Sequence, residues 1–330
     1  MEFILITLPG LSKIVKRELI LKNIENVKEL SDSRVLVDSS FEKLAKLRTI
    51  EGVAKVLNIY QLDEISTRSI RLILRNFFRE YNISNLLKEG MNLKVATFPR
   101  QRFSRYFLKL IALRELKRVY GDFKETRHGK TLRIDLINDL LILGIDLLKH
   151  LYQRDYTTFK HPAMLNPLIA SALAIILNIK REDIVVDPFV GSGTILIEAT
   201  LLHNCEGFGF DINYDYVKGA YTNSIRANVD SKVSFFTGDI SRIRYSRDYE
   251  VIITDPPRGI RIKVDSIKRI YVNLYEFIKK SISKGGRIGL ATPYEDIAVK
   301  LAKDFKIELR KECTVLQGGK WISLMKGTIL

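Results

Sequence analysis

The sequence predicts an α/β protein whose C-terminal half is a doubly wound, Rossmann-like domain with an antiparallel edge, preceded by α+β domains. From Asn166 onward, helical and strand patterns alternate strictly, which predicts a parallel sheet with helices on both faces. A glycine-rich turn follows the first strand of this half, as in nucleotide-binding folds. The first half lacks this alternation and carries most of the excess positive charge.

Residues 1–62 predict a small α+β unit of ferredoxin-like type. A buried strand over Phe3–Thr7 precedes Pro9-Gly10, and apolar residues at helical spacing then predict a helix over Leu11–Leu21. The next expected elements are a strand at Val35–Val37, a helix from Phe41 to about Ile50 and a strand near Val53–Ile59.

Residues 63–150 predict a second α+β unit, followed by a linker over residues 151–165. Its expected helices are Ile65–Tyr81 and the basic amphipathic Arg105–Tyr120. Its expected strands are Leu93–Ala96, Thr131–Leu136 and Leu140–Gly144.

Residues 166–330 form the predicted Rossmann-like domain. The expected helices are Asn166–Leu177, Ile195–Leu202, Tyr214–Ala227 and Ile270–Ser283. The expected parallel strands are Ile184–Asp187, Gly207–Asp211, Val233–Phe236, Val251–Asp255 and Arg287–Ala291. Two extended stretches, Lys306–Val315 and Trp321–Leu330, predict a hairpin that closes the sheet edge.

The charge balance favours a polyanionic partner, because 54 Lys and Arg against 38 Asp and Glu give a net charge of +16. Residues 1–160 hold 30 basic and 19 acidic side chains (30 − 19 = +11), and residues 161–330 hold 24 and 19 (24 − 19 = +5). Between Lys94 and Arg133, 12 basic residues alternate with aromatic ones, which suits RNA. The alternative is a solvated helix face whose apolar side chains lie in the core, and for Phe107 and Leu110 we favour this alternative. The predicted RNA-binding residues are Arg100, Arg102, Arg105, Lys109, Arg127 and Lys130.

Other chemistry has little support in the sequence. Cys205 and Cys313 lie far apart without CxxC spacing, so we expect neither a disulfide framework nor a metal site. The apolar start meets Pro9-Gly10 after eight residues, which favours a strand over a signal peptide or membrane span. We therefore expect a cytoplasmic protein without membrane contact, either a monomer or a weak homodimer.

The glycine-rich turn is the segment Val186-Asp187-Pro188-Phe189-Val190-Gly191-Ser192-Gly193-Thr194. Its glycines let a ligand approach the backbone closely. The turn lacks the lysine of a P-loop, and Leu196 stands where a dinucleotide motif needs a third glycine. Asp187 would repel a diphosphate, so a cationic sulfonium cofactor suits this turn better.

Acidic residues also end the second strand and follow the third. Asp211 lies about 20 residues beyond the turn, where an acid binds ribose hydroxyls, and Asp239 can accept from an adenine amino group. The alternative is that these acids cap helices or stabilise turns. The predicted cofactor-binding residues are Asp187, Phe189, Gly191, Gly193, Thr194, Asp211, Ile212, Asp239, Ile240 and Asn166.

The fourth strand ends in Asp255-Pro256-Pro257-Arg258. Two prolines fix the backbone and remove two donors, which leaves carbonyl oxygens and the Asp255 carboxylate as acceptors. Such acceptors can bind the hydrogens of an amino group on a purine ring and return electron density to its nitrogen, which can then attack a sulfonium methyl group. The alternative is a rigid loop without a chemical role. The predicted catalytic residues are Asp255, Pro256, Pro257 and Arg258.

The segments 187–199 and 255–257 resemble those of Rossmann-fold methyltransferases that act on nucleobase amino groups. More specifically, residues 151–156 and 161–167 are similar to the junction in THUMP-domain-containing tRNA guanine-N2 methyltransferases, above all the archaeal acceptor-stem type. The resemblance implies that S-adenosylmethionine is the cofactor and that residues 63–150 are a THUMP-like domain that binds tRNA. It also implies that a guanosine is methylated at N2, with position 6 as the first choice. The family usually has an aromatic residue at the place of Arg258, whose guanidinium plane can also stack on a base.

Four alternatives remain open at this point. Within the same class, the target can be guanosine 10 of tRNA or the N6 amine of an adenine in RNA. Outside it, the chain can be an RNA-binding protein with an inactive methyltransferase domain, although Asp187 and Asp255 are both present. A nicotinamide oxidoreductase is disfavoured by the missing third glycine.

Overall fold

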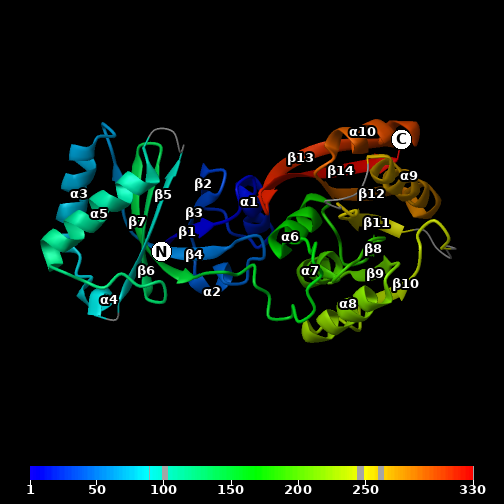
Figure 1. Cartoon of the computed structure of the whole chain (residues 1–330), viewed down its shortest axis with the longest axis horizontal. Coiled ribbons are helices and arrows are strands. Elements are labelled where there is room, and N and C mark those ends of the chain that lie inside the picture. The colour runs from blue at the N-terminus through cyan, green and yellow to red at the C-terminus, as the bar shows by residue number, and fades with distance from the viewer. Residues whose placement is uncertain (89, 99–102, 244–248, 259–263, 330) are drawn as a thin grey trace. The chain divides into compact units, whose positions relative to one another are not determined.

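The computed structural model describes residues 1–88, 90–98, 103–243, 249–258 and 264–329 (Figure 1). The chain forms two compact units. Unit 1 comprises Met1–Ile6, Asn23–Lys46 and Glu51–His150, and unit 2 comprises Thr7–Lys22, Leu47–Ile50 and Leu151–Leu330. Among the described residues, no helix is long and apolar enough to cross a membrane, and no cluster of metal-binding side chains occurs.

Unit 1 is built on one seven-stranded sheet in the order β2-β3-β1-β4-β7-β6-β5. The long strand β4 (Gly52–Gln61) pairs with β1 (Glu2–Ile6) on one side and β7 (Leu140–Leu148) on the other. It thereby joins the two predicted α+β regions in one sheet. The other elements are β2 (Val27–Ser31), β3 (Arg34–Asp38), β5 (Met91–Phe98), β6 (Lys130–Ile137), α2 (Phe41–Leu44), α3 (Thr67–Glu80), α4 (Ser84–Lys88) and α5 (Arg105–Tyr120).

Three expectations for this region were wrong. The strand β2 was not foreseen, because only Leu30 among its residues is buried and the pattern is weak. The helix expected over 41–50 ends at Leu44, and beyond it the amides of Arg48 and Thr49 donate to the Glu18 carboxylate and not along a helix. Phe107 and Leu110 are 44% and 43% exposed, because α5 turns a neighbouring face, which includes Leu108 and Ile111, toward the core.

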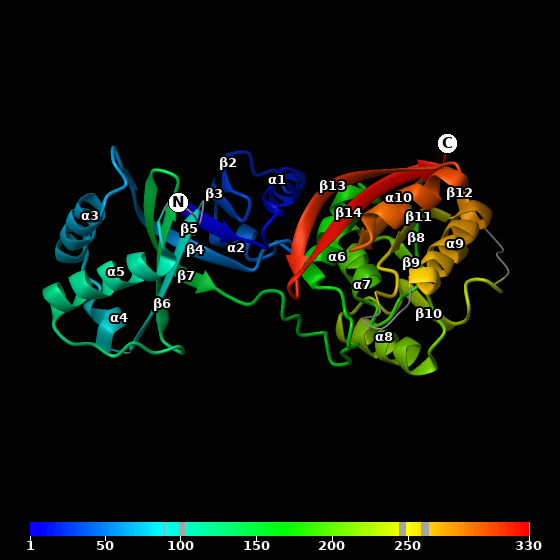
Figure 2. The ribbon, with the colours of Figure 1, turned by 45° about the horizontal axis from the view of Figure 1, so that its top comes forward.

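Unit 2 contains a second seven-stranded sheet, in the order β10-β9-β8-β11-β12-β14-β13. The strands from β10 to β12 are parallel and the last two antiparallel, which confirms the predicted doubly wound domain with its C-terminal hairpin (Figure 2). The strands are β8 (Ile184–Asp187), β9 (Glu206–Asp211), β10 (Val233–Thr237), β11 (Tyr249–Thr254), β12 (Ile282–Thr292), β13 (Ile307–Gln317) and β14 (Lys320–Ile329). The helices are α1 (Ser12–Leu21), α6 (Pro167–Ile176), α7 (Thr194–His203), α8 (Tyr214–Arg226), α9 (Val264–Ser281) and α10 (Glu295–Asp304).

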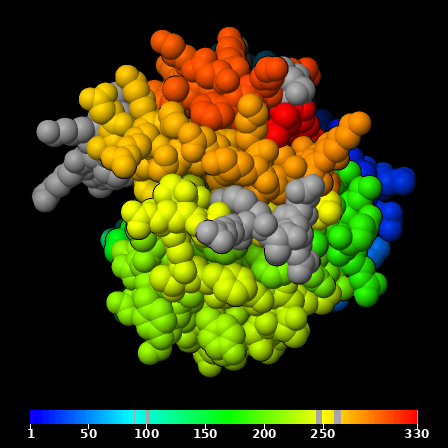
Figure 3. All heavy atoms as spheres, turned by 90° about the vertical axis from the view of Figure 1, so that its right-hand side faces the viewer, coloured from blue at the N-terminus to red at the C-terminus, as the bar shows by residue number. Residues whose placement is uncertain are grey.

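Alternation along the central strands of unit 2 builds a core on each face of the sheet. Val185 and Val251 pack with α1, α6 and α7, whereas Val186 and Ile252 pack with α9 and α10. Figure 3 shows one face of this unit, with α9 and α10 in gold and orange above α8 in yellow-green. The helices on both faces leave the carboxyl ends of the parallel strands as the place for a ligand.

Candidate functional site

A cavity of about 500 Å³ in unit 2, here called the acid-lined cavity, lies at the carboxyl ends of the parallel strands. Asp187 ends β8, Asp211 ends β9, and Asp239 and Asp255 follow β10 and β11. The fold therefore brings four acids from four successive strands to one space. The predicted residues that line it are Asp187, Phe189, Gly191, Thr194, Asp211, Ile212, Asp239, Ile240, Asp255, Pro256, Pro257 and Arg258.

The glycine-rich turn connects β8 to α7 and adopts a conformation that favours glycine. The backbone φ is 51° at Gly191 and 78° at Gly193, in the left-handed region. The Gly191 amide donates to Asp211 Oδ2 at 3.0 Å, so the turn is tied to the end of β9. Gly193 precedes the first residue of α7 and lies outside the lining, and a Cβ there would lie 3.1 Å from the Ala220 Cβ.

Asn166 also lies outside the lining of the acid-lined cavity. Its side-chain oxygen caps α6 by accepting from the Leu168 amide at 2.9 Å. Its own amide donates to Gln317 Oε1 at 3.2 Å, and the Gln317 Nε2 donates to the Met164 carbonyl at 3.1 Å. Gln317 thus links the end of β13 to the segment that includes Met164, a residue of the cavity lining.

Asp187 is almost completely buried beneath the cavity, and burial raises its pKa to about 7. Its Oδ1 accepts from the Thr254 hydroxyl at 2.6 Å and from the Phe189 amide at 3.1 Å. These hydrogen bonds oppose the effect of burial, while the charges of Asp255 and Asp211 add to it. A positive ligand in the cavity would favour the ionised form of Asp187.

Asp211 and Asp239 are held by amides that follow them. Asp211 Oδ1 accepts from the Asn213 amide at 3.0 Å. Asp239 Oδ1 accepts from the amide and hydroxyl of Ser241 at 2.9 Å and 2.8 Å, and these bonds lower the pKa of Asp239. Both carboxylates line the cavity, as does Ile212, which is 73% exposed.

Asp255 and Arg258 form an ion pair at the rigid bend after β11. The Arg258 Nε donates to Asp255 Oδ1 at 2.5 Å, and the two side chains are 16% and 10% exposed. Burial raises the pKa of Asp255 to about 6, against the opposing effect of Arg258. The Tyr294 hydroxyl donates to the Arg258 carbonyl at 3.2 Å and so fixes the backbone of the loop.

Several residues that line the cavity were not singled out from the sequence, above all His161 and Tyr216. Their rings meet edge to face with centroids 4.4 Å apart. Burial lowers the pKa of His161, and its Nδ1 accepts from the Ala163 amide at 3.1 Å. His161 falls in a stretch assigned to a linker, where no helical or strand period marked it for the site.

Glu198, one turn into α7, anchors distant segments of unit 2. It is completely buried and accepts hydrogen bonds from Arg48 at 2.6 and 2.7 Å and from Arg154 at 2.9 and 3.3 Å. The hydroxyls of Tyr156 and Ser171 also donate to it, at 2.7 and 2.6 Å. Burial alone would raise the pKa of Glu198, but the arginines outweigh burial and lower it. The helix that follows the glycine-rich turn is therefore held by residues from three other segments.

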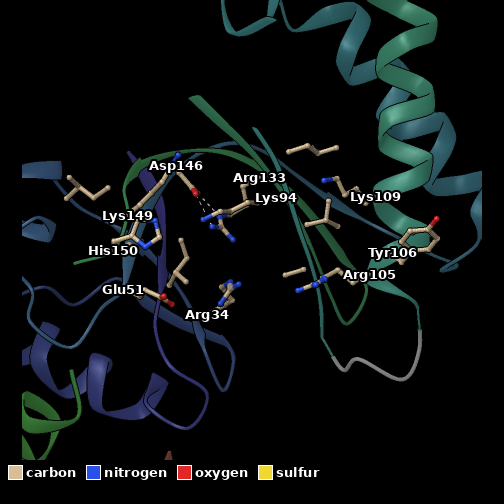
Figure 4. A pocket seen from close by; sticks show the side chains of 16 residues that line it. Arg34, Glu51, Lys94, Arg105, Tyr106, Lys109, Arg133, Asp146, Lys149 and His150 are labelled. Carbon is tan, nitrogen blue, oxygen red and sulfur yellow. Dashed lines mark hydrogen bonds and ion pairs between the residues drawn. The ribbon is translucent and has the colours of Figure 1, made fainter. Parts of the chain in front are cut away.

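Unit 1 contains a second cavity of about 500 Å³, here called the basic cavity (Figure 4). Six Lys or Arg side chains line it, against the two acids Glu51 and Asp146. Figure 4 shows Arg34 and Arg105 pointing into the same space from opposite sides. The six basic residues are Arg34, Lys94, Arg105, Lys109, Arg133 and Lys149.

Two of these arginines are buried in ion pairs and form a fixed wall. Arg34 Nε donates to Asp135 Oδ2 at 2.8 Å and lies over the Phe98 ring, 5.0 Å from its centroid. Arg133 makes two hydrogen bonds to Asp146, at 2.6 and 3.0 Å. The other four basic residues are at least partly exposed, which leaves positive charge available to phosphate groups.

The predicted RNA-binding residues divide into three groups. Arg105 and Lys109, on the first turns of α5, line the basic cavity. Arg127 and Lys130 are exposed outside its lining, and Arg100 and Arg102 lie outside the described residues. Strand pairing brings further basic residues to the cavity that were not among the predicted RNA-binding residues: Arg34, Lys94, Arg133 and Lys149. Arg34, for example, lies 101 residues from its partner Asp135 along the chain.

Comparison with known proteins supports these observations. Residues 154–323, more than half of the chain, match the family model described as RMKL-like, methyltransferase domain. The tRNA (guanine(6)-N2)-methyltransferase of Methanocaldococcus jannaschii is 26% identical over 97% of this chain and 97% of that protein. The tRNA (guanine(10)-N2)-dimethyltransferase of Pyrococcus abyssi is 31% identical, over 45% of each chain.

Among solved structures, TrmN from Thermus thermophilus is similar over the whole chain. The TM-score is 0.84, with 20% sequence identity, and the match covers 100% of this chain and 99% of the other. At this level of identity the likeness establishes the fold of both halves.

Proposed function

The chain belongs to the RMKL-like methyltransferase family, and from this premise we propose that it transfers the methyl group of S-adenosylmethionine to N2 of a guanosine in tRNA. The observation that carries the proposal is the convergence of Asp187, Asp211 and Asp239 with the Asp255-Pro256-Pro257 bend in one cavity. The first choice of target is the guanosine at position 6, in the acceptor stem, as in the relative that spans nearly the whole chain.

The residues of the acid-lined cavity fit this cofactor. S-adenosylmethionine supplies an electrophilic methyl group on a positively charged sulfur. Asp211 would accept from the ribose hydroxyls and Asp239 from the adenine amino group. Exposed Ile212 beside Asp211 offers an apolar surface to the adenine ring, and the acids complement the positive charge.

Asp255 and the Pro256 carbonyl would orient the amine that attacks. Neither proline has an amide hydrogen, so the bend presents acceptors only. Hydrogen bonds from the amine to these acceptors localise the nitrogen lone pair, which the purine ring otherwise delocalises. The cofactor would supply the methyl group that this nitrogen takes up and would leave as S-adenosylhomocysteine. The Asp255 carboxylate would accept the proton that the nitrogen loses.

Unit 1 would hold the tRNA through the basic cavity. The four basic side chains of its lining that are at least partly exposed would provide phosphate contacts, and Tyr106 in the lining, 73% exposed, would provide a stacking surface. We propose that residues 1–62 and 63–150 are the ferredoxin-like and THUMP-like domains, followed by a linker over 151–165 and the catalytic domain over 166–330. The protein would act in the cytoplasm as a monomer or weak homodimer.

The direct test is to incubate unmodified tRNA with the protein and isotope-labelled S-adenosylmethionine, followed by nucleoside mass spectrometry. We expect labelled N2-methylguanosine, and its absence in the Asp255→Ala variant. Label in N6-methyladenosine would reject guanosine in favour of adenine. The absence of label from both N2-methylguanosine and N6-methyladenosine would reject the proposed function.

The second candidate is guanosine 10, which the partial similarity to tRNA (guanine(10)-N2)-dimethyltransferases favours. Those relatives match over less than half of the chain, so they inform only part of it. Nuclease fragmentation of the labelled tRNA separates the candidates, because position 6 and position 10 fall in different fragments. Dimethylated guanosine in the position 10 fragment would establish the second candidate.

A further inference from the structure

The acid-lined cavity contains one resident cation. Four of its lining residues are acids, and Arg258 is the only Lys or Arg in the lining as far as the described residues extend. The Arg258 guanidinium lies against Asp255, the acid of the proposed catalytic bend. A positively charged ligand that approaches the Asp255 carboxylate must therefore share it with Arg258, and the Arg258 guanidinium repels that ligand.

The attachment of Arg258 differs from that of Arg48, another partly buried arginine of unit 2. Arg48 uses two nitrogens on Glu198. Arg258 donates to Asp255 through Nε, and its buried Nη2 group makes no hydrogen bond to any described residue. A buried donor without a partner costs free energy, so this guanidinium is held less firmly than a fully bonded one.

The two ligands of a methyltransferase differ in charge at the sulfur. S-adenosylmethionine carries a sulfonium, whereas S-adenosylhomocysteine, the product, has a neutral thioether and otherwise the same groups. A fixed charge in the cavity therefore changes the affinities of the two ligands unequally. Both Asp255 and Arg258 line the cavity of about 500 Å³ that is proposed to hold these ligands, so the charge of each contributes to the electrostatic potential there.

We propose that Arg258 is an internal counter-ion that sets the relative affinity of the cavity for the sulfonium cofactor and the thioether product. Arg258 compensates the Asp255 carboxylate and so lowers the preference for the sulfonium. The cavity therefore discriminates less between S-adenosylmethionine and S-adenosylhomocysteine. Arg258 also keeps Asp255 ionised before the amine arrives. The inference rests on the proposed use of S-adenosylmethionine, but not on the identity of the methylated base.

The test is titration calorimetry of both ligands, at about pH 8.5 so that carboxyls with raised pKa values are ionised. For Arg258→Met, we expect the ratio of the Kd of S-adenosylhomocysteine to that of S-adenosylmethionine to rise about tenfold. Arg258→Lys retains the charge and should leave the ratio close to that of the wild type. The matched control is Arg310→Met, since Arg310 pairs with Glu308 on the surface, outside the cavity lining.

Asp255→Asn provides an independent variant, because it removes the carboxylate and leaves Arg258 uncompensated. The same ratio should then fall about tenfold, and the double variant Asp255→Asn with Arg258→Met should return toward the wild-type ratio. An unchanged ratio in either single variant, with both ligands bound, would overturn the inference. A wild-type protein that binds neither ligand would instead reject the proposed function.

Discussion

In the proposed site, Asp211 would combine a structural and a ligand-binding task in one carboxylate. It already accepts hydrogen bonds from the amides of Gly191 and Asn213, and it borders the cavity where ribose hydroxyls would add two more donors. An ionised acceptor is worth more to a hydroxyl than a neutral one. The residue therefore ties the glycine-rich turn to the cofactor.

We expect Asp211→Ala to weaken S-adenosylmethionine binding by about 1.5–3 kcal/mol, because two hydroxyls lose a charged acceptor. Calorimetric titration measures this change. Asp215→Ala is the matched control, since Asp215 is exposed four residues further on and does not line the cavity. Equal affinities for Asp211→Ala and the control would remove Asp211 from the site.

Asp255 should make methyl transfer depend on pH. Its pKa is raised to about 6, and only the ionised form can accept hydrogens from the amine through both oxygens. The rate of a single turnover with saturating cofactor should therefore be full above about pH 6 and should fall as the pH drops below that value. Bound cofactor, being positive, would move this pKa downward.

The variant Asp255→Asn should have a much lower rate with no inflection near that pH, while its affinity for tRNA stays close to wild type. Asp187 also titrates, with a pKa raised to about 7, so saturating cofactor is needed to separate binding from transfer. A variant with an unchanged pH profile would show that another group controls the reaction.

The start of α7 shows how one turn positions a helix. Gly193 and Gly319 both have φ of 78°, but their surroundings differ. A Cβ at Gly193 would lie 3.1 Å from the Ala220 Cβ and 3.3 Å from the Phe235 ring, whereas Gly319 has no atom within 4 Å of that position. Alanine substitutions at the two positions therefore separate the effect of backbone strain from the effect of packing on stability.

We expect Gly319→Ala to lower the free energy of unfolding by about 1 kcal/mol through strain alone. Gly193→Ala should lower it by about 1–3 kcal/mol more through overpacking, and should also weaken cofactor binding, because the turn lines the site. Urea unfolding of both variants measures the difference. Equal losses of stability would mean that the packing around Gly193 adapts without cost.

Under the proposed function, the two units would give the whole molecule two separable activities. Charges that line the basic cavity of unit 1 should control affinity for tRNA, because phosphate contacts dominate binding to nucleic acids. The acid-lined cavity of unit 2 should control cofactor affinity and rate. Substitutions in one cavity are then expected to leave the affinity of the other cavity for its own ligand unchanged.

We expect Lys94→Glu and Arg105→Glu each to weaken tRNA binding and to reduce the slope of log affinity against log salt by about one. Cofactor affinity should not change. Lys28→Glu makes the same charge change on exposed β2, outside the cavity lining, and serves as the control. If this control weakens tRNA binding as much, net charge and not the basic cavity governs the interaction.

The acid-lined cavity was largely predictable from the sequence, because parallel strands bring their carboxyl ends to one edge of a sheet. Asp187, Asp211, Asp239 and Asp255 could be placed together once the alternation of helices and strands was recognised. His161 could not, since it lies in an irregular segment that only the packing against Tyr216 places at the cavity.

The sequence by itself determined the order of the elements, the doubly wound domain and the acids at its strand ends, because periodicity and turn residues are local properties of the chain. Only the tertiary structure decided which distant charges pair. The links from Arg48 to Glu198 and from Arg34 to Asp135 span 150 and 101 residues, and the pairing of Arg258 with Asp255 depends on a side-chain orientation. Strand register and packing fix such contacts, and a pattern along one element contains no information about the partner that another element supplies.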